Sequence, residues 1–264
     1  RMAKAAAGEN ILLSEPKEGK VNLTAACEGL LCINTELLYD VNMEEEVCFS
    51  TIHGNKMTKK GKLLAGTRVI PLVVKEEIVA DFEKKCQQLG PLIQVKPFLS
   101  MKIGIVVTGS EVLEGRIKDQ FSPVLEAKAK ELGSEVAGDD KEKIREEIVN
   151  WMKKGADMVW VSGGMSVDPD DRTPAAIRSL GGQVVTYGTP VLPGAMFMLS
   201  YVNGIPVIGL PGCVMYAKRT VFDLAVPRIL AGETLTRMDF VKMAHGGMCL
   251  NCKECVYPDC GFGA

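Results

Sequence analysis

Two neighbouring glycines and a run of carboxylates follow an apolar segment in the middle of the chain. Gly163 and Gly164 come shortly after residues 157–161, which have the pattern of a buried strand. Thr173 and Pro174 predict the N-cap and first residue of a helix, whose free N–H groups suit an anion. The intervening carboxylates are Asp168, Asp170 and Asp171. Carboxylates beside an anion site suit a bound metal ion or a heterocycle with N–H donors. An ordinary surface loop is the competing interpretation of this segment alone.

Four cysteines are clustered near the C-terminus, in the pattern C-x2-C-x2-C-x4-C. They are Cys249, Cys252, Cys255 and Cys260. With no secretory signal pattern in the chain, clustered thiols suit metal better than disulfides. Four thiolates bind either Zn²⁺ or an iron–sulfur cluster, and the sequence leaves both open, although the tight steps are closer to a ferredoxin-type run. A tail of free thiols is the alternative. We expect a metal to supply most of the folding energy of this tail.

Strands and helices alternate from residue 102 onward. Apolar strand patterns are followed by helix patterns that end at glycines, and this alternation predicts a parallel sheet covered on both faces. The expected strands are 103–107, 157–161, 183–187 and 205–210, and the expected helices are 121–132, 141–154, 173–180 and 214–230. Ligands of such sheets bind beyond the carboxyl ends of the strands.

Small and polar residues follow three of these strands, and we therefore expect their loops to converge on one ligand. Hydroxyls and glycine backbones suit a phosphate, whereas aspartates suit a metal or ring N–H groups. The predicted binding residues are Thr108, Gly109, Ser110, Glu111, Ser162, Gly163, Gly164, Met165, Ser166, Asp170, Pro193, Gly194, Pro211 and Gly212. Asp119, Asp168 and Asp171 are the candidate catalytic residues.

The N-terminal region has a different pattern. Strands are expected at 21–26 and 68–74 and helices at 28–42 and 75–89, which predicts a small α+β domain. The expected domain organisation is 1–98, 99–240 and a cysteine-rich tail over 241–264.

Composition and charge exclude some classes of function. The net charge of −2 gives no general attraction to nucleic acid, and no apolar run is long enough to span a membrane. The free-cysteine usage predicts a cytoplasmic protein.

The segment 102–232 resembles the molybdenum-cofactor biosynthesis domain family. The resemblance is carried by Thr108–Val112 with Gly115 and Asp119, by Gly163–Val167 and its acidic continuation, by Leu192–Gly194, and by Gly209–Gly212. It implies a three-layer α/β/α fold that binds molybdopterin or its adenylylated form, with Mg²⁺ and loop aspartates. Related domains often form homo-oligomers.

The chain departs from the best-known members of that family. Cys213 stands where the molybdate-inserting enzymes commonly have asparagine, and residues 10–95 do not match their larger framework. The chain is more similar to stand-alone molybdopterin-binding proteins with a cysteine-rich tail. Three functions follow as hypotheses: a molybdopterin molybdotransferase, a non-catalytic carrier that docks on a molybdoenzyme, and a nucleotide-pyrophosphate hydrolase.

Overall fold

The computed structural model describes residues 1–108, 121–137, 144–165 and 172–263. Contacts divide the chain into two compact units, Arg1–Phe98 and Leu99–Ala264. The described helices include none that is both long and apolar enough to cross a membrane.

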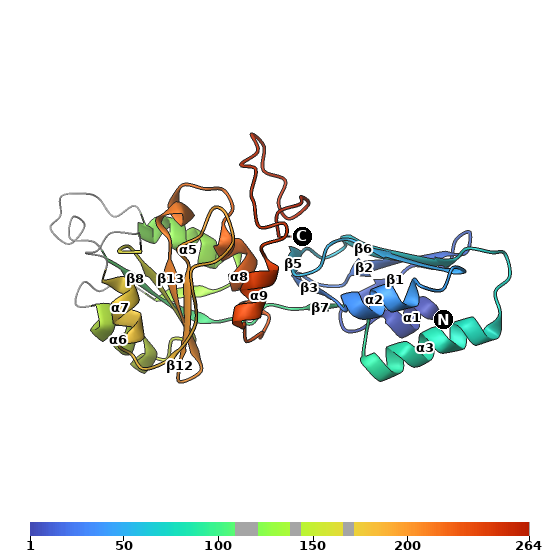
Figure 1. The fold of residues 1–264 in the computed structure, drawn as a ribbon, viewed down its shortest axis with the longest axis horizontal. Helices are drawn as coiled ribbons and strands as arrows, with labels where there is room; N and C mark the ends of the chain where they lie inside the picture. The colour runs from blue at the N-terminus through green and yellow to red at the C-terminus, as the bar shows by residue number, and fades with distance from the viewer. Residues whose placement is uncertain (109–120, 138–143, 166–171, 264) are drawn as a thin grey trace. The chain divides into compact units, whose positions relative to one another are not determined.

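The first unit is an α+β fold with two antiparallel sheets (Figure 1). One sheet has the strand order β1-β2-β6-β4 and the other has the order β5-β3-β7. Its elements are α1 (Met2–Ala6), β1 (Ile11–Leu13), β2 (Lys20–Ala25), β3 (Gly29–Ile33), α2 (Thr35–Val41), β4 (Val47–Thr51), β5 (Lys56–Thr58), β6 (Leu63–Val69), α3 (Glu76–Leu89) and β7 (Ile93–Lys96). The three helices pack on a core that includes Leu23, Phe49 and Phe82.

The second unit is built on a six-stranded sheet with the order β11-β12-β13-β10-β8-β9. Its strands are β8 (Lys102–Val107), β9 (Glu135–Ala137), β10 (Met158–Ser162), β11 (Gln183–Tyr187), β12 (Met198–Val202) and β13 (Ile205–Leu210). β10 is buried along its whole length and pairs in parallel with both β8 and β13. A central parallel strand covered on both faces needs this continuous apolar character.

Helices cover both faces of this sheet. They are α5 (Phe121–Glu131), α6 (Ile144–Lys153), α7 (Thr173–Arg178), α8 (Val221–Leu230) and α9 (Arg237–Lys242), with a short 3₁₀ helix η1 (Gly212–Met215) before α8. Trp151 of α6 packs with Val159 and Val161 on one face. Trp160 points to the other face, where its ring meets Phe222 of α8 edge-on at 4.9 Å. The predicted three-layer α/β/α architecture is therefore confirmed.

Several local predictions were wrong. The segment expected to be one helix over 28–42 contains β3 and then α2, because the apolar residues of 29–33 pair with β5 and β7. The strand expected at 68–74 is β6, which ends at Val69. The expected helix 214–230 is interrupted, because Thr220 and Asp223 form a capping box that starts α8 afresh. Two strands, β9 and β12, were not predicted, and β12 runs antiparallel to its neighbours.

Thr173 does not cap α7. The helix begins at Thr173 itself and its N-cap residue is Arg172, which makes no side-chain capping bond. The hydroxyl of Thr173 instead donates to the carbonyl of Gly163 at 2.8 Å. The hydroxyl thus donates to a carbonyl outside the helix, whereas a capping hydroxyl accepts from an N–H of its own helix.

Candidate functional site

Three neighbouring strands end side by side at one edge of the sheet. Ser162 at the end of β10 lies in register with Val107 of β8 on one side and with Leu210 of β13 on the other. The chain therefore leaves the sheet at adjacent points as Thr108, Gly163 and Pro211. This edge brings together the starts of all three loops that the sequence predicts to bind a ligand.

Gly163 ties the first two loops together. It has a left-handed φ of +93°, and a Cβ there would collide with the carbonyl oxygen of Thr108. The N–H of Thr108 donates to the carbonyl of Ser162 at 2.7 Å. Thr173, fully buried, holds the same junction, since its hydroxyl reaches both Gly163 and, at 3.4 Å, the hydroxyl of Thr108. Gly163 is required by this close approach of two loops as well as by any ligand.

The two predicted binding residues beside this junction differ in how they can contribute. Thr108 is half-buried, and its hydroxyl lies 3.4 Å from that of Thr173. Met165 is 3% exposed, and its side chain packs in the core against Gly209. Met165 can therefore offer a ligand only its backbone.

A second wall comes from the loop before β12. Gly194 has a φ of +128°, and a Cβ there would run into Val221 at the start of α8. The N–H of Val221 donates to the carbonyl of Pro193 at 3.1 Å. Gly212, by contrast, is exposed, and a Cβ on it would meet none of the described atoms within 4 Å. None of the described residues therefore fills the space beside Gly212.

The remaining predicted residues of this edge fall outside the described part of the chain. They are Gly109, Ser110, Glu111, Asp119, Ser166, Asp168, Asp170 and Asp171. The described residues therefore contribute the hydroxyl and glycine half of the expected site.

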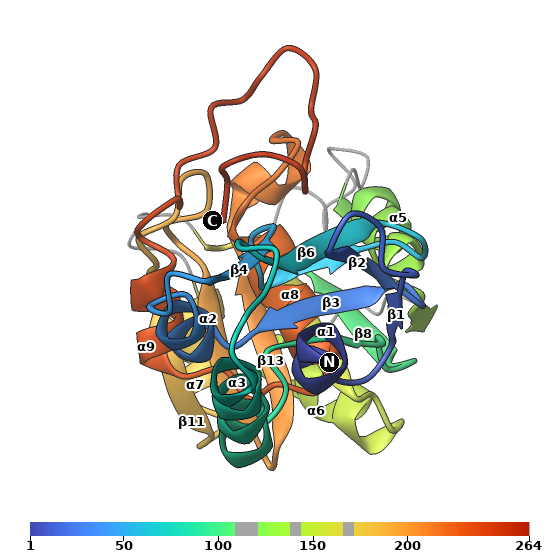
Figure 2. The same ribbon diagram turned by 90° about the vertical axis from the view of Figure 1, so that its right-hand side faces the viewer.

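The four tail cysteines line one pocket of about 190 Å³. The tail is the dark-red segment after α9, and it runs beside the segment that precedes α8 (Figures 1 and 2). The same pocket is lined by Lys218, Arg219, Tyr257 and Phe262. Within the described ranges, however, no group of three or more His, Cys, Asp or Glu side chains is arranged to hold a single metal ion.

The tail is anchored to α8 by polar and aromatic contacts. The phenol of Tyr257 donates to the carbonyl of Asp223, and the Lys218 ammonium donates to the carbonyls of Cys252 and Lys253 at 3.0 and 2.8 Å. The guanidinium of Arg219 lies over the ring of Tyr257 at 4.9 Å.

Arg219 is itself held by a buried carboxylate. Its guanidinium is 2.8 Å from Asp223, which is 5% exposed and also 3.4 Å from Lys128. Burial works to lower the pKa of Arg219, but the hydrogen bond and ion pair with Asp223 outweigh it and raise that pKa. The same cation lines the cysteine pocket, so a fixed positive charge faces the cysteines.

The cysteine pocket and the predicted ligand loops share two segments. Leu192 forms a parallel bridge with Met248, and its N–H and carbonyl bond Gly247 and Cys249, both at 2.8 Å. The loop that starts at Pro211 ends at Lys218 and Arg219, in the pocket wall. A structural change in the cysteine pocket can therefore be transmitted to the loop at Leu192 and to the loop that starts at Pro211.

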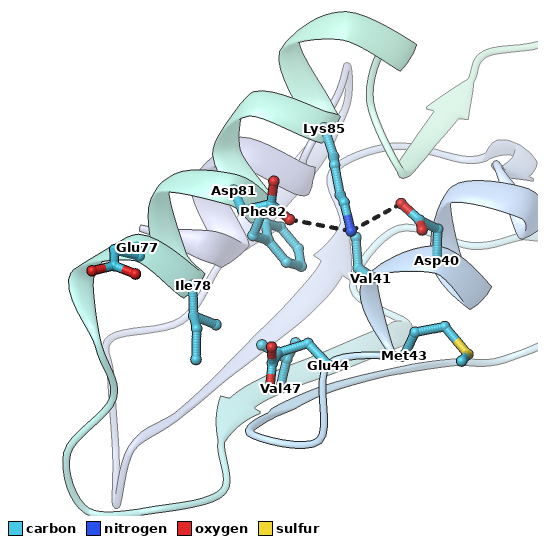
Figure 3. A pocket seen from close by; sticks show the side chains of 10 residues that line it. All are labelled: Asp40, Val41, Met43, Glu44, Val47, Glu77, Ile78, Asp81, Phe82 and Lys85. Carbon is cyan, nitrogen blue, oxygen red and sulfur yellow. Dashed lines mark ion pairs between the residues drawn. The ribbon is translucent and has the colours of Figure 1, made fainter.

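A larger hollow of about 410 Å³ lies within the first unit, between α2 and α3 (Figure 3). Lys85 crosses it, with its ammonium 3.1 Å from Asp40 and 3.2 Å from Asp81. The Lys85–Asp40 pair joins the two helices, whereas the Lys85–Asp81 pair lies within α3. The predicted site residues include none from this hollow.

Sequence reasoning missed four residues that organise the second unit's sites. They are Thr173, Lys218, Arg219 and Tyr257. Thr173 was interpreted as a cap, and Lys218 and Arg219 lay inside a segment taken for continuous helix. Tyr257 carried a usable signal, since an aromatic residue between clustered cysteines in a polar tail suggests an anchor.

Comparison with known proteins finds similarity within the second unit. A model of the probable molybdopterin binding domain matches residues 104–231. CinA-like proteins of Mycobacterium sp. (strain MCS) and Mycolicibacterium vanbaalenii are 34% and 36% identical over 96 and 90 residues. Those alignments cover 34% and 32% of this chain but 23% and 21% of the relatives, so the match spans under a quarter of their length.

Solved structures with similar folds have low sequence identity. The molybdopterin biosynthesis enzyme MoaB from Thermus thermophilus is 17% identical with a TM-score of 0.41, over 50% of this chain and 98% of that one. The molybdopterin biosynthesis MoeA protein from Pyrococcus horikosii is 16% identical with a TM-score of 0.40, over 88% of this chain and 79% of that one.

Proposed function

Because residues 104–231 belong to the probable molybdopterin binding domain family, we propose that this unit binds molybdopterin at the edge formed by Thr108, Gly163 and Pro211 and serves molybdenum cofactor biosynthesis. The observation that carries the proposal is the register of Val107, Ser162 and Leu210, which aligns three ligand-type loops.

The described residues fit the phosphate end of such a ligand. Thr108 offers a half-buried hydroxyl, and the Gly163-Gly164 turn offers backbone N–H groups with left-handed φ values of +93° and +55°. Donors of this kind suit a phosphate. Thr173 acts as a positioning residue, because it fixes the carbonyl of Gly163 and the hydroxyl of Thr108 from beneath.

The aspartates are assigned the metal and heterocycle end. Asp168, Asp170 and Asp171 follow the same glycine turn in the sequence, and Asp119 follows the β8 loop. Carboxylate oxygens are suitable ligands for Mg²⁺, which would neutralise charge on a phosphate. These roles are proposed from the sequence alone.

For the activity, we propose transfer of molybdate into adenylylated molybdopterin. In support, acidic residues and phosphate donors leave one strand end together, which a reaction on a metal-bound phosphoanhydride needs. The contacts between the cysteine tail and the ligand loops favour a second role, in which the chain holds the finished cofactor for a molybdoenzyme.

Binding and turnover separate these roles. Molybdopterin affinity is measured for the wild type, for Asp168→Asn and Asp171→Asn, and for Thr24→Val in the first unit as the control. Loss of one buried hydrogen bond to a charged group costs about 1.5–3 kcal/mol, or roughly tenfold to a hundredfold in affinity. Normal affinity in both aspartate variants would remove the assignment. Release of AMP from the adenylylated form with Mg²⁺ and molybdate identifies a transferase, whereas tight binding without AMP release identifies a carrier.

A further inference from the structure

We propose that the cysteine pocket is the binding site of one [4Fe–4S] cluster, with Cys249, Cys252, Cys255 and Cys260 as its four thiolate ligands. This proposal does not depend on what the loops at the sheet edge bind.

The shape of the pocket favours a cluster over a single zinc ion. A zinc ion bound to four thiolates at about 2.3 Å leaves its sulfurs only ~3.8 Å apart, in mutual contact with no space between them. Here the four cysteines are among the residues that line a pocket of about 190 Å³. A cubane cluster fills such a space, because each thiolate binds a different iron atom.

The spacing of the ligands agrees with a single cluster. In two-cluster ferredoxins the fourth cysteine of a similar run reaches the other cluster. Here all four cysteines border one pocket, so one cluster can use them all.

The charge of the wall suits an anionic cluster. Four thiolates around a 2+ core give a net charge of about 2−, which needs nearby cations. Lys218 and Arg219 line the pocket together with the cysteines. A cation fixed by Asp223 at 2.8 Å cannot easily turn away from the pocket. Hydrogen bonds to cluster sulfurs raise the reduction potential.

The tail also has packing and hydrogen bonds that do not involve the cysteine side chains. Tyr257 and Phe262 are buried with their rings 6.2 Å apart, and the N–H of Gly263 closes the segment on the carbonyl of Gly246 at 2.9 Å. These contacts add to whatever folding energy a metal supplies to the tail.

The test uses the full chain, purified anaerobically and reconstituted with ferric iron, sulfide and dithiothreitol. Dithiothreitol supplies the two electrons that convert four ferric ions and four sulfides into the 2+ core. We expect about four iron and four sulfide per chain, visible absorption, and a paramagnetic signal after one-electron reduction.

Matched cysteine variants locate the site. Cys255→Ser and Cys260→Ser should each lose more than half of the iron, whereas Cys48→Ser in the first unit should retain it. The far-ultraviolet circular dichroism of the full chain should remain near wild type in all three variants. Arg219→Lys, which keeps the charge, should keep the cluster, while Arg219→Gln should lower its reduction potential.

Three results would overturn the proposal. They are stoichiometric zinc without iron in the anaerobically purified chain, less than about one iron per chain after reconstitution, and unchanged iron in the folded Cys255→Ser and Cys260→Ser variants.

Discussion

The phenol oxygen of Tyr257 lies 2.9 Å from the backbone carbonyl oxygen of Asp223 and donates its hydrogen to it. This bond joins the cysteine tail to α8, and the carboxylate of the same Asp223 holds Arg219 against the tail from the other side. Asp223 of α8 thus positions both Tyr257 and the Arg219 cation, which line the cysteine pocket.

Removing that bond should loosen the tail selectively. Tyr257→Phe keeps the buried ring but loses one hydrogen bond, which costs about 0.5–1.5 kcal/mol. We expect faster proteolysis and faster amide exchange after Gly246, with β8, β10 and β13 unchanged. Tyr216→Phe, at a side chain that is 82% exposed, is the control and should behave as the wild type. Equal exchange in the two variants would show that the phenol does not anchor the tail.

Two glycines at the sheet edge should respond differently to alanine. In Gly163→Ala the Cβ would meet Thr108 in a left-handed conformation, so we expect a loss of about 1–3 kcal/mol in unfolding free energy. In Gly212→Ala the Cβ enters open space, and the unfolding free energy should change by less than about 0.5 kcal/mol. Urea denaturation measures both. A stable Gly163→Ala variant would mean that the two loops are not held in close contact.

Gly212 then tests the ligand independently of stability. If the ligand approaches the Pro211-Gly212 turn, the larger Gly212→Val should weaken molybdopterin binding while the far-ultraviolet circular dichroism stays near wild type. Unchanged affinity would make this turn a plain connection.

Arg219 should matter more for stability than its neighbour. Arg219→Gln leaves the buried carboxylate of Asp223 with Lys128 at 3.4 Å as its remaining charged partner, which costs about 2 kcal/mol. Lys218→Gln, at an exposed side chain that bonds only to carbonyls in the described contacts, should cost less than about 0.5 kcal/mol. Thermal unfolding compares them, and equal losses would contradict the proposed role of the Asp223–Arg219 pair.

The thiols should differ in reactivity according to burial. Burial raises the pKa of the Cys86 thiol to about 11, so it stays protonated near neutral pH. Cys252 and Cys255 are exposed. In metal-free protein at pH 8, iodoacetamide should therefore label these two before Cys86, as peptide mass spectrometry can measure. Early labelling of Cys86 would show that the core around α3 opens readily.

The same thiol predicts an alkaline weakness of the first unit. The unfolded thiol ionises near its ordinary pKa while the folded one resists up to about 11. Its contribution to stability is therefore complete below about pH 8.5 and declines as the pH rises toward 11. Cys86→Ala should show a smaller decline in unfolding free energy over that range, and an identical decline would assign the effect to other groups.

The architecture of the second unit follows from its sequence because its signals are strong. In the sequence, buried strands such as β10 are continuous apolar runs, and glycines follow the helices between them. Two of the failures have a common cause, since local patterns were overridden by partners outside the segment. Residues 28–42 have apolar residues at helical spacing, yet residues 29–33 pair with β5 and β7, and Thr173 gives its hydroxyl to Gly163 rather than to its own helix.

The candidate site was predictable in its loops but not in its supports. Glycines and hydroxyls at strand ends are visible in the sequence, and strand register then places them together. Arg219 and Asp223 lie only four residues apart, but Tyr257, which contacts both, is distant along the chain, and no spacing rule relates it to them. Met165 shows the converse, because its place in the motif gives no sign that its side chain turns into the core.

Amide hydrogen exchange with and without molybdopterin shows whether the ligand binds at the sheet edge. The ligand should slow exchange at residues 162–165 and 211–215, where β10 and β13 end beside Val107 of β8, and should leave exchange in Arg1–Phe98 unchanged. Unchanged exchange at both of these segments under saturating ligand, or protection confined to Arg1–Phe98, would contradict binding at the sheet edge.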